Sequence, residues 1–303
     1  MITVGRTEIV ETFAEAFGMT AARVVITADT PRWALAAARA MTGFATSVIG
    51  CRCEAGIEGK LAAETTPDLR PGVSVLIFAF DRKGLGERLV DRIGQCVMTC
   101  PTTACFDGLS GGLGGDGAVS VGGKLRFFGD GYQIAKRLNG RRLWRVPVMD
   151  GEFLIDDRFG TQKAVGGGNL LILGRDRAAT LAATEAAVEA MRAVPDVILP
   201  FPDGVVRSGS KVGSRYKALP ASTNDAYCPT LRGFAPESEV PEDLNCVLEI
   251  VIDGLDAAAV KAAMGAGLHA AAAAGAARIS AGNYGGTLGQ FHFPLHDLLE
   301  SAG

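Results

Sequence analysis

Histidine is scarce in this sequence, and an excess of basic residues is absent. Among 303 residues there are 3 His, 30 Lys and Arg, and 33 Asp and Glu, which gives a formal net charge of −3. Nucleic-acid binding requires a surplus of positive charge, so we do not expect that class of function. The sequence places none of the three His beside a Cys or Ser, so a nucleophile would lack an adjacent base. Covalent catalysis is therefore disfavoured.

Long apolar runs are also absent. No run reaches the roughly 20 residues that are needed to span a bilayer. The N-terminal stretch MITVGRTEIVETF has acidic residues where a secretory signal has its apolar core. We therefore expect a cytoplasmic protein without a membrane partner.

Two separate cysteine pairs with the spacing of a zinc site are missing as well. Cys51 and Cys53 are separated by one residue, and Cys96, Cys100 and Cys105 follow later. Structural zinc sites instead combine two pairs of ligands, each pair spaced by about two to four residues, into a tetrahedron. In a reducing cytoplasm we expect the seven Cys to be small buried side chains. We expect no bound metal.

The sequence does have enough apolar residues, 48%, to form a large core, and its 21% of charged residues argues against disorder. Four segments repeat the pattern of an apolar strand, a helix and a second strand that ends in a Gly-rich loop. They cover residues 22–59, 73–109, 169–210 and 246–289. Residues 122–160 instead carry the turn signals Asn139-Gly140 and Asp150-Gly151, which predict an antiparallel meander.

Two such repeats that share one sheet predict a ferredoxin-like lobe. The predicted fold is therefore an α/β (α+β) sandwich of two ferredoxin-like lobes, each a mostly antiparallel mixed sheet flanked by helices. We place the boundary after residue 148, which gives an N-terminal lobe of residues 1–148 and a C-terminal lobe of residues 149–303.

One Gly-rich stretch formally matches a dinucleotide-binding motif. Gly112, Gly114 and Gly117 satisfy G-x-G-x-x-G. That motif binds a nucleotide only between a strand and a helix. Here it precedes VSVGGKLRFF, which reads as a strand, so nucleotide binding is disfavoured.

Glu249 is the strongest single candidate for a catalytic residue. It is the only charged residue in the apolar strand CVLEIVI, where alternation puts it on the same face as Val247 and Val251. A carboxylate there is costly unless it is paired or protonated. Desolvation would raise its pKa and suit it to acid–base work near neutrality, whereas the structural alternative is an ion pair with a neighbouring strand.

Two irregular segments are candidate binding loops. Residues 207–230 mix basic residues with hydroxyl and amide side chains and are longer than an ordinary connection, so they are either a solvated loop or a binding loop with a cationic rim. The glycines of ISAGNYGGTLGQ, residues 279–290, allow close backbone approach to a ligand. The candidate binding residues from both loops are Ser210, Lys211, Arg215, Ser222, Thr223, Asn224, Asp225, Tyr227, Asn283 and Tyr284.

Several irregular stretches resemble one known family, the formylmethanofuran:tetrahydromethanopterin formyltransferases. In order along the chain they are FAEAF (13–17), GFATSVI (43–49), EAGI (54–57), DRIGQCVMT (91–99), FFGDGYQ (127–133), SKVGS (210–214), LPASTNDAYCPT (219–230), EIVIDGL (249–255) and ISAGNYGGTLGQ (279–290). Because they are long, ordered and spread over nearly the whole chain, the resemblance is specific.

The resemblance implies a distal-type N-terminal lobe, a proximal-type C-terminal lobe, a homotetramer and no permanently bound cofactor or metal. It implies formyl transfer between N5 of tetrahydromethanopterin and the primary amine of methanofuran, with both carriers in a cleft and Glu249 as the catalytic candidate. The near balance of charge and the Gly-rich 108–123 stretch are similar to the bacterial methylotroph version, which is one component of a formyltransferase/hydrolase complex in formaldehyde oxidation.

Direct transfer in a ternary complex needs no enzyme nucleophile, which suits this sequence. We expect Glu249 to shuttle the proton, donors from Ser222, Thr223, Asn224 or Asn283 to stabilise the oxyanion, and Lys211 and Arg215 to hold the acidic tail of the furan carrier. Two alternatives stay open. One is a non-catalytic scaffold subunit of a one-carbon enzyme complex, and the other is a different acyltransferase such as a folate-dependent enzyme.

Overall fold

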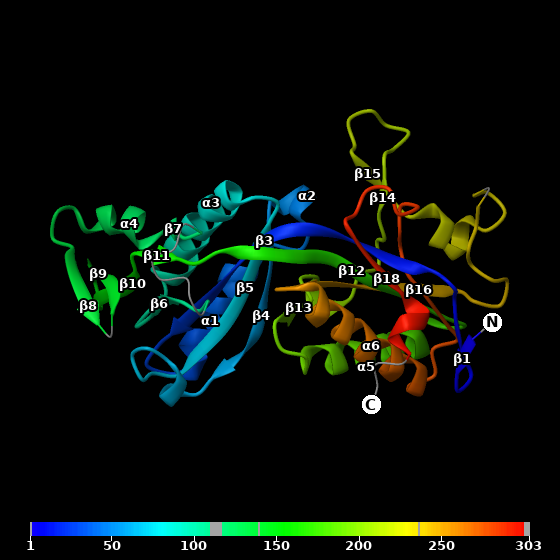
Figure 1. Ribbon diagram of the computed structural model, residues 1–303, viewed down its shortest axis with the longest axis horizontal. Helices are drawn as coiled ribbons and strands as arrows, with labels where there is room; N and C mark the ends of the chain where they lie inside the picture. Colours follow the sequence, from blue (N-terminus) through cyan, green and yellow to red (C-terminus); the bar gives the residue numbers. More distant parts are fainter. Residues whose placement is uncertain (1, 110–116, 139, 236, 300–303) are drawn as a thin grey trace. The chain divides into compact units, whose positions relative to one another are not determined.

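The computed structural model describes residues 2–109, 117–138, 140–235 and 237–299, and it contains two compact units (Figure 1). We call Gly18–Ala164 the N-terminal unit, and Met1–Phe17 with Val165–Gly303 the C-terminal unit. The long strands β3 (Phe13–Thr27) and β12 (Gln162–Gly174) each contain a point at which the chain passes from one unit to the other. The boundary after residue 148 stays a prediction.

The N-terminal unit is built on a β-α-β-β-α-β arrangement with the sheet order β4-β5-β3-β6. A meander, β10-β9-β8, extends this sheet, and β10 runs parallel to β6. The remaining elements of the unit are α1 (Pro31–Thr42), α2 (Val48–Cys51), β4 (Glu54–Leu61), β5 (Gly72–Ala79), α3 (Arg82–Arg92), β6 (Ala104–Asp107), β7 (Val119–Ser120), α4 (Gly122–Leu125), β8 (Ile134–Leu138), β9 (Arg141–Val148), β10 (Gly151–Asp156) and β11 (Arg158–Phe159).

The C-terminal unit repeats the same arrangement with the sheet order β17-β12-β16-β13. Strand β2 extends it beside β17, and β18 pairs with the first residues of β3. The elements of the unit are β1 (Ile2–Val4), β2 (Thr7–Ile9), α5 (Arg177–Arg192), β13 (Val197–Ile198), β14 (Lys211–Val212), β15 (Ala221–Ser222), β16 (Cys246–Gly254), α6 (Ala257–Ala273), β17 (Arg278–Ser280) and β18 (Phe291–Pro294). Both units are thus ferredoxin-like mixed sheets flanked by helices, as the sequence predicts.

Local sequence explains where the helices begin. Asp81, Asp176 and Asp256 each precede a helix, and each side chain accepts a backbone N–H three residues later, at 2.8, 2.9 and 2.8 Å. Such N-caps satisfy donors that the first helical turn leaves free. Helix α1 begins as predicted after Thr30 with Pro31 in its first turn, but the Thr30 side chain makes no cap bond.

Different parts of the chain pack on the two faces of the C-terminal sheet. Helices α5 and α6 lie on one face, where small residues let them approach closely (Figure 1). A Cβ on Gly168 of β12 would lie 2.5 Å from Val260 of α6, so this approach requires glycine. The other face packs Leu171 and Leu173 against Tyr227, Val240 and Leu244, which belong to the connection between β13 and β16, rather than against a long helix. This second face, which we call the open face, therefore has room for a pocket.

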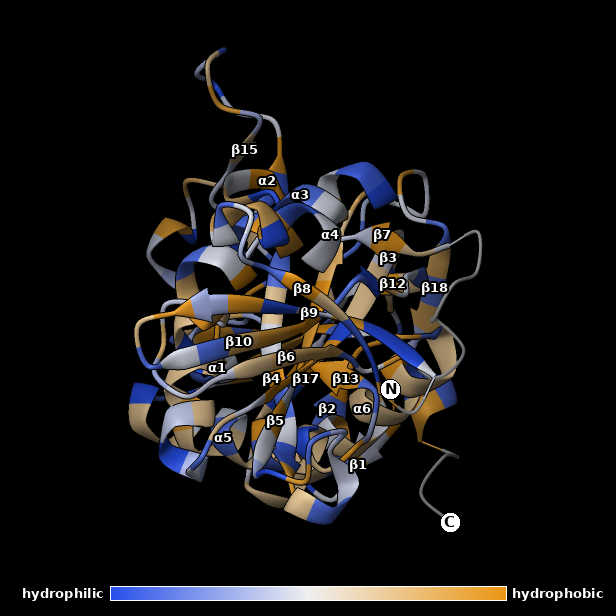
Figure 2. Cartoon of the chain, turned by 90° about the vertical axis from the view of Figure 1, so that its left-hand side faces the viewer, coloured by the Kyte–Doolittle hydropathy of each residue, from blue (hydrophilic) through white to orange (hydrophobic). Residues whose placement is uncertain are grey.

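The hydrophobic core of the N-terminal unit lies between its sheet and the helices α1 and α3. Strands β6 and β10 are coloured largely towards the hydrophobic end of the scale in Figure 2. No helix in the described ranges has both the length and the apolar character that crossing a membrane requires.

The structure differs from the sequence prediction at one stretch of the N-terminal unit. The stretch VSVGGKLRFF is not the strand that the sequence suggests, because only Val119–Ser120 is extended and helical turns follow at 122–129. Two adjacent glycines give this stretch little strand preference of its own. Gly112 and Gly114 of the formal nucleotide motif lie outside the described residues. The predicted meander is confirmed for β9 and β10, with β8 beginning at Ile134.

Candidate active site on the open face of the C-terminal sheet

Glu249 lies in the middle of strand β16, and its backbone is fixed from both sides. On one side it stands opposite Leu171 of β12. On the other side its N–H donates to the carbonyl of Val206 at 2.9 Å and its carbonyl accepts from the Val206 N–H at 2.8 Å. A side chain on a strand held in this way has a fixed position and direction.

The strand register gathers several polar groups on the open face. Leu171 stands opposite Glu249 on one side and opposite Ser280 of β17 on the other. Residues directly opposite in register point to the same face of a sheet. The side chains of Glu249 and Ser280 therefore share the open face, two strand spacings apart, which is about 10 Å.

A pocket opens beside Glu249. Its empty volume is about 300 Å³, which includes space open to solvent. Its lining comes from β16, from Leu171 of the neighbouring strand β12, from residues 206–209 and from the turn at 224–228. The lining residues are Leu171, Val206, Arg207, Ser208, Gly209, Asn224, Tyr227, Cys228, Val247, Leu248 and Glu249. All of them belong to the C-terminal unit.

The environment of Glu249 favours its protonated form. Burial raises the pKa of the Glu249 carboxyl from 4.5 to about 7. The side chain is half-buried, and no ion pair to it is present among the described residues. The alternative raised by the sequence, an ion pair between Glu249 and a neighbouring strand, is therefore not formed by the described residues. A carboxyl that titrates near neutrality can both accept and donate a proton.

Two tyrosines stand near this acid. The Tyr227 hydroxyl lies 3.1 Å from the Ser280 hydroxyl, and burial raises the pKa of Tyr227. Burial also raises the pKa of Tyr284, and the negative charges of Glu249 and Glu15 raise it further. Both phenols therefore stay protonated over the range in which Glu249 titrates, and they can act as hydrogen-bond donors.

The structure places the predicted binding residues of the 207–230 segment in two groups. Asn224 and Tyr227 line the Glu249 pocket. The others lie on or beside the β14–β15 hairpin, where Lys211 donates to both carboxylate oxygens of Asp225 at 2.7 and 2.6 Å. The Lys211 ammonium lowers the pKa of Asp225. Lys211 therefore already forms an ion pair within the protein, although its side chain lies partly at the surface.

The remaining predicted residues of the hairpin face local partners or solvent. The Ser222 hydroxyl donates to the Gly213 carbonyl at 2.8 Å, and the Thr223 hydroxyl lies 3.3 Å from the Ser208 carbonyl. Ser210 and Arg215 are exposed. Of the predicted oxyanion donors in this segment, Asn224 is the one whose place in the pocket lining suits the role best.

The 281–290 loop is held by β3 rather than left open. Asn283 donates from Nδ2 to the Thr12 hydroxyl at 3.1 Å and to the Phe13 carbonyl at 3.2 Å, and its Oδ1 accepts from the Gly285 N–H at 3.0 Å. Its amide is therefore used structurally. The Glu15 carboxylate accepts four further backbone N–H groups of the loop.

Sequence reasoning missed several residues of this region. Glu15 carries the same signal as Glu249, because it is a lone acid between apolar residues in FAEAF. Ser280 and the turn at 206–209 carry no local signal, since their place depends on pairing between distant strands. Cys228 also lines the pocket, where its thiol lies 3.3 Å from the Asn224 carbonyl.

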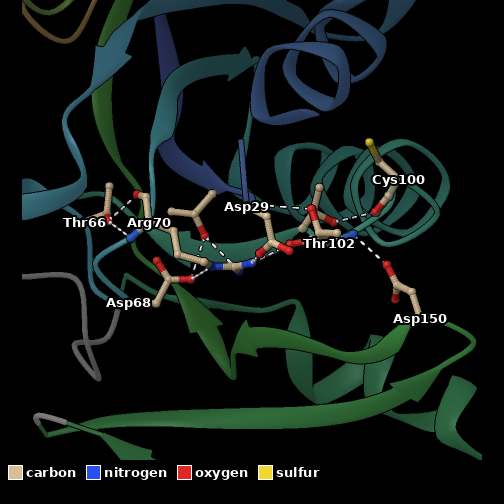
Figure 3. Close-up of polar contacts among 9 residues, drawn as sticks. Asp29, Thr66, Asp68, Arg70, Cys100, Thr102 and Asp150 are labelled. Atoms are coloured by element: carbon tan, nitrogen blue, oxygen red, sulfur yellow. Dashed lines mark hydrogen bonds and ion pairs between the residues drawn. The ribbon is translucent and has the colours of Figure 1, made fainter. Parts of the chain in front are cut away.

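A second polar centre lies in the N-terminal unit around Arg70 (Figure 3). Its guanidinium donates to Asp68 at 2.8 Å, to Asp29 at 2.9 Å and to the Thr102 carbonyl at 2.6 Å. The Thr102 N–H in turn donates to Asp150 at 2.6 Å. Arg70 therefore ties several loops together and has few donors left for a ligand.

A buried acid pair lies in the same unit. Burial raises the pKa of Asp156 to about 6 although Arg141 opposes this, and burial also raises the pKa of Asp107. The Arg141 guanidinium donates to Asp156 at 2.5 Å. Both carboxyls are almost fully enclosed, with exposed fractions of 0 and 2%, so this group is a structural one.

The described residues contain no cluster of three or more His, Cys, Asp or Glu that could hold a metal ion. All seven Cys are free thiols. Cys53 and Cys105 are buried as expected, but the other five are only half-buried, so the expectation of general burial is wrong for them. Five of the seven belong to the N-terminal unit, whereas Glu249 belongs to the C-terminal unit.

Comparison with protein families gives two matches that together span the chain. The profile described as "Formylmethanofuran-tetrahydromethanopterin formyltransferase" matches residues 2–148. The profile described as "FTR, proximal lobe" matches residues 151–298.

Individual relatives are similar over almost their full length. A formylmethanofuran–tetrahydromethanopterin formyltransferase of Methylobacillus flagellatus is 57% identical, covering 95% of this chain and 97% of that protein. A component of the formyltransferase/hydrolase complex of Methylorubrum extorquens is 54% identical over 98% of this chain and 97% of that protein. The enzyme of Methanopyrus kandleri is 52% identical over 96% and 98%.

Two solved structures have the same fold. One is a crystal structure of the formyltransferase/hydrolase complex from Methylorubrum extorquens in complex with methylofuran, with a TM-score of 0.94, 53% identity and 98% coverage of both chains. The other is the formyltransferase from Methanosarcina barkeri, with a TM-score of 0.92, 47% identity, and coverage of 98% of this chain and 100% of that chain.

Proposed function

Since this chain belongs to the formylmethanofuran–tetrahydromethanopterin formyltransferase family, we propose that it moves a formyl group between N5 of tetrahydromethanopterin and the primary amine of methanofuran. It is an N-formyltransferase, that is, an acyltransferase. The observation that carries the proposal is the Glu249 carboxyl, which lines a pocket on the open face and has its pKa raised to about 7.

The reaction requires two proton movements. The attacking amine forms a bond to the formyl carbon and loses a proton, while the bond from that carbon to the leaving nitrogen breaks and this nitrogen gains a proton. Ionised Glu249 accepts the first proton and then donates it to the leaving nitrogen, so the carboxylate is regenerated. The formyl oxygen gains negative charge in between, and Asn224 stabilises it from the pocket wall.

Direct transfer between two bound carriers relies on positioning. Holding two reactants in the correct geometry can lower a barrier by about 7–11 kcal/mol, and an oxyanion donor by about 3–4 kcal/mol. In this scheme Tyr227 belongs to the pocket wall, and Asn283 and Tyr284 belong to the loop beside it that receives the carriers. Ser210, Lys211 and Arg215 lie on the rim that meets an anionic carrier tail. The exposure of Ser210 and Arg215 supports a rim position.

The physiological setting is a further part of the proposal. We propose transfer towards formylmethanofuran in formaldehyde oxidation, in the cytoplasm, by a chain that forms a homotetramer or joins other subunits of a formyltransferase/hydrolase complex. The similarity to a component of that complex in Methylorubrum extorquens supports such partners. Both carriers act as co-substrates, with no permanently bound cofactor, and lobes of residues 1–148 and 149–303 correspond to the distal and proximal types.

The decisive experiment uses the purified chain with both carriers. Formyl-tetrahydromethanopterin and methanofuran are incubated with the protein, and formylmethanofuran is measured by chromatography. Formation of product that depends on intact Glu249 supports the proposal. No product in either direction would leave the non-catalytic scaffold as the better explanation. Competition by formyl-tetrahydrofolate at similar concentration would point to the folate-dependent alternative.

A further inference from the structure

We propose that Glu15 is a positioning residue for this reaction, which anchors the 281–290 loop so that Tyr284 stands beside the Glu249 site. The inference rests on the proposed function for its kinetic consequence, but its structural part can be tested without turnover. Glu15 is not one of the residues that line the pocket, and its carboxylate binds the loop, so we propose that it acts through the loop.

The anchor consists of one carboxylate and four backbone N–H groups. Oε2 accepts from Tyr284 at 2.6 Å and from Gly286 at 2.9 Å. Oε1 accepts from Leu288 at 2.7 Å and from Gly289 at 2.5 Å. Both oxygens are thereby used, and the residue is only 1% exposed. A buried carboxylate with this many donors is a strong local constraint on the loop.

The charge of this anchor persists at every working pH. Burial alone would raise the pKa of Glu15, but the four backbone hydrogen bonds outweigh it and lower the pKa to about 2. Glu15 therefore stays ionised while Glu249 titrates. An ionised carboxylate offers acceptor positions only, which matches four N–H donors.

The position of the loop on the sheet comes from its first residues. Ala281 and Gly282 directly follow Ser280, which is level with Glu249 across β12. Asn169 of β12 holds Gly282 on this face, since its Oδ1 accepts from the Gly282 N–H at 2.6 Å and its Nδ2 donates to the Gly282 carbonyl at 3.1 Å. Asn169 therefore fixes the beginning of the loop and Glu15 fixes the rest.

The contact with β3 is close enough to require glycine at one position. A Cβ on Gly289 would lie 2.5 Å from the Ala16 carbonyl oxygen and 2.7 Å from Cγ of Glu15. Glycine there lets the loop approach the strand that carries Glu15. Burial raises the pKa of Tyr284, and the charges of Glu249 and Glu15 raise it further, so this tyrosine lies within electrostatic reach of both carboxyls.

The test begins with Glu15→Gln, which keeps the shape but replaces one oxygen by an NH2 group. Two of the four backbone donors would then face a donor, so the loop should loosen. We expect kcat to fall about 10- to 100-fold, because small misplacements of groups around a reaction can cost this much. Glu11→Gln is the matched control, since Glu11 is exposed and lies in the same segment.

A double-mutant cycle separates positioning from general structural damage. Glu15→Gln, Tyr284→Phe and the double variant are compared for kcat. If Glu15 acts through Tyr284, the double variant should be no slower than the worse single variant. Fully multiplicative losses, or an unchanged kcat in Glu15→Gln, would overturn the proposal.

Amide hydrogen exchange by mass spectrometry provides a readout that does not depend on activity. Exchange in the 284–289 segment should speed up at least 10-fold in Glu15→Gln and stay unchanged in Glu11→Gln, since lost acceptors expose these amides. If Glu15→Gln fails to fold, Glu15→Asp is used, which keeps the charge but shortens the reach, and intermediate exchange is expected. Unaltered exchange in a folded variant contradicts the anchor. Absence of turnover in the unmodified protein would instead count against the proposed function.

Discussion

Glu249 and Ser280 stand opposite the same residue, Leu171, from the two sides of strand β12. This register puts two groups on one face of the sheet. They are the Glu249 carboxyl, whose pKa burial raises to about 7, and the Ser280 hydroxyl, which is hydrogen-bonded to the Tyr227 hydroxyl. The opposite face is filled by two helices, so the chemistry has only the open face available. Tyr227, Val240 and Leu244 cover part of that face, and the pocket lies beside Glu249.

Removing the Glu249 carboxyl should greatly slow catalysis and should change carrier binding little. Glu249→Gln is nearly isosteric and cannot carry a proton between nitrogens, so we expect kcat to fall about 10²- to 10⁴-fold. Carrier dissociation constants should change less than about fivefold, because the pocket shape is kept. Steady-state kinetics and calorimetric titration measure the two. Glu185→Gln, on the exposed side of α5, is the control. Near-normal turnover would remove Glu249 from the mechanism.

The raised pKa of Glu249 should also appear in the pH dependence of stability. Its folded-state pKa of about 7 lies above its ordinary 4.5, so its contribution is fully present below about pH 4.5 and is lost as the pH rises through 7. At 1.36 kcal/mol per pKa unit the loss is roughly 3 kcal/mol at most. Urea unfolding of the unmodified protein and Glu249→Gln between pH 4 and 8 tests this. The difference between their unfolding free energies should fall over that window, and a flat difference is the contrary result.

The Lys211–Asp225 pair offers a way to learn which role Lys211 has. If its ammonium holds the anionic tail of the furan carrier, Lys211→Ala should raise KM for that carrier about 10-fold and keep kcat. Asp225→Ala should then lower this KM, since it releases the ammonium from the carboxylate that now binds it at 2.6–2.7 Å. Equal losses in both variants would show that the pair only supports the hairpin.

Cys228 tests whether the formyl group passes directly between carriers. Its thiol lines the pocket and lies near the Asn224 carbonyl, so a covalent route through it has to be checked. For direct transfer we expect Cys228→Ser to keep kcat within about threefold, because a nucleophile would lose far more. Mass spectrometry of protein incubated with one carrier should detect no formyl adduct. A formylated Cys228 would replace the ternary-complex mechanism.

Gly289→Ala should weaken both the loop and the fold. The added Cβ would lie 2.5 Å from the Ala16 carbonyl oxygen, so either the loop or β3 has to move. We expect a loss of about 1–3 kcal/mol in the free energy of unfolding, as for other overpacked sites. Urea unfolding measures it. Gly59→Ala is the control, because a Cβ there has nothing within 4 Å, and a similar loss in the control would argue against the steric reason.

Much of the fold follows from local sequence. The four strand–helix–strand repeats are present, since alternating and helical hydrophobic periods and the Asp caps are properties of neighbouring residues. The 119–129 stretch is the exception, where two glycines leave the choice between strand and helical turn to packing. Glu249 was also identifiable from sequence, because a single charge within CVLEIVI is costly whatever the surroundings.

Outside the 119–129 stretch, the sequence by itself determined which segments are strands and helices, that Glu249 would be desolvated, and which loops carry polar groups. Only the tertiary structure decided that Ser280 and Glu249 share a level, that Lys211 pairs with Asp225, and that Glu15 holds a loop some 270 residues away. The physical reason is that hydrophobic periodicity and capping act over a few residues. Strand register and the partner of a buried carboxylate depend instead on contacts between distant parts of the chain, which no local pattern encodes.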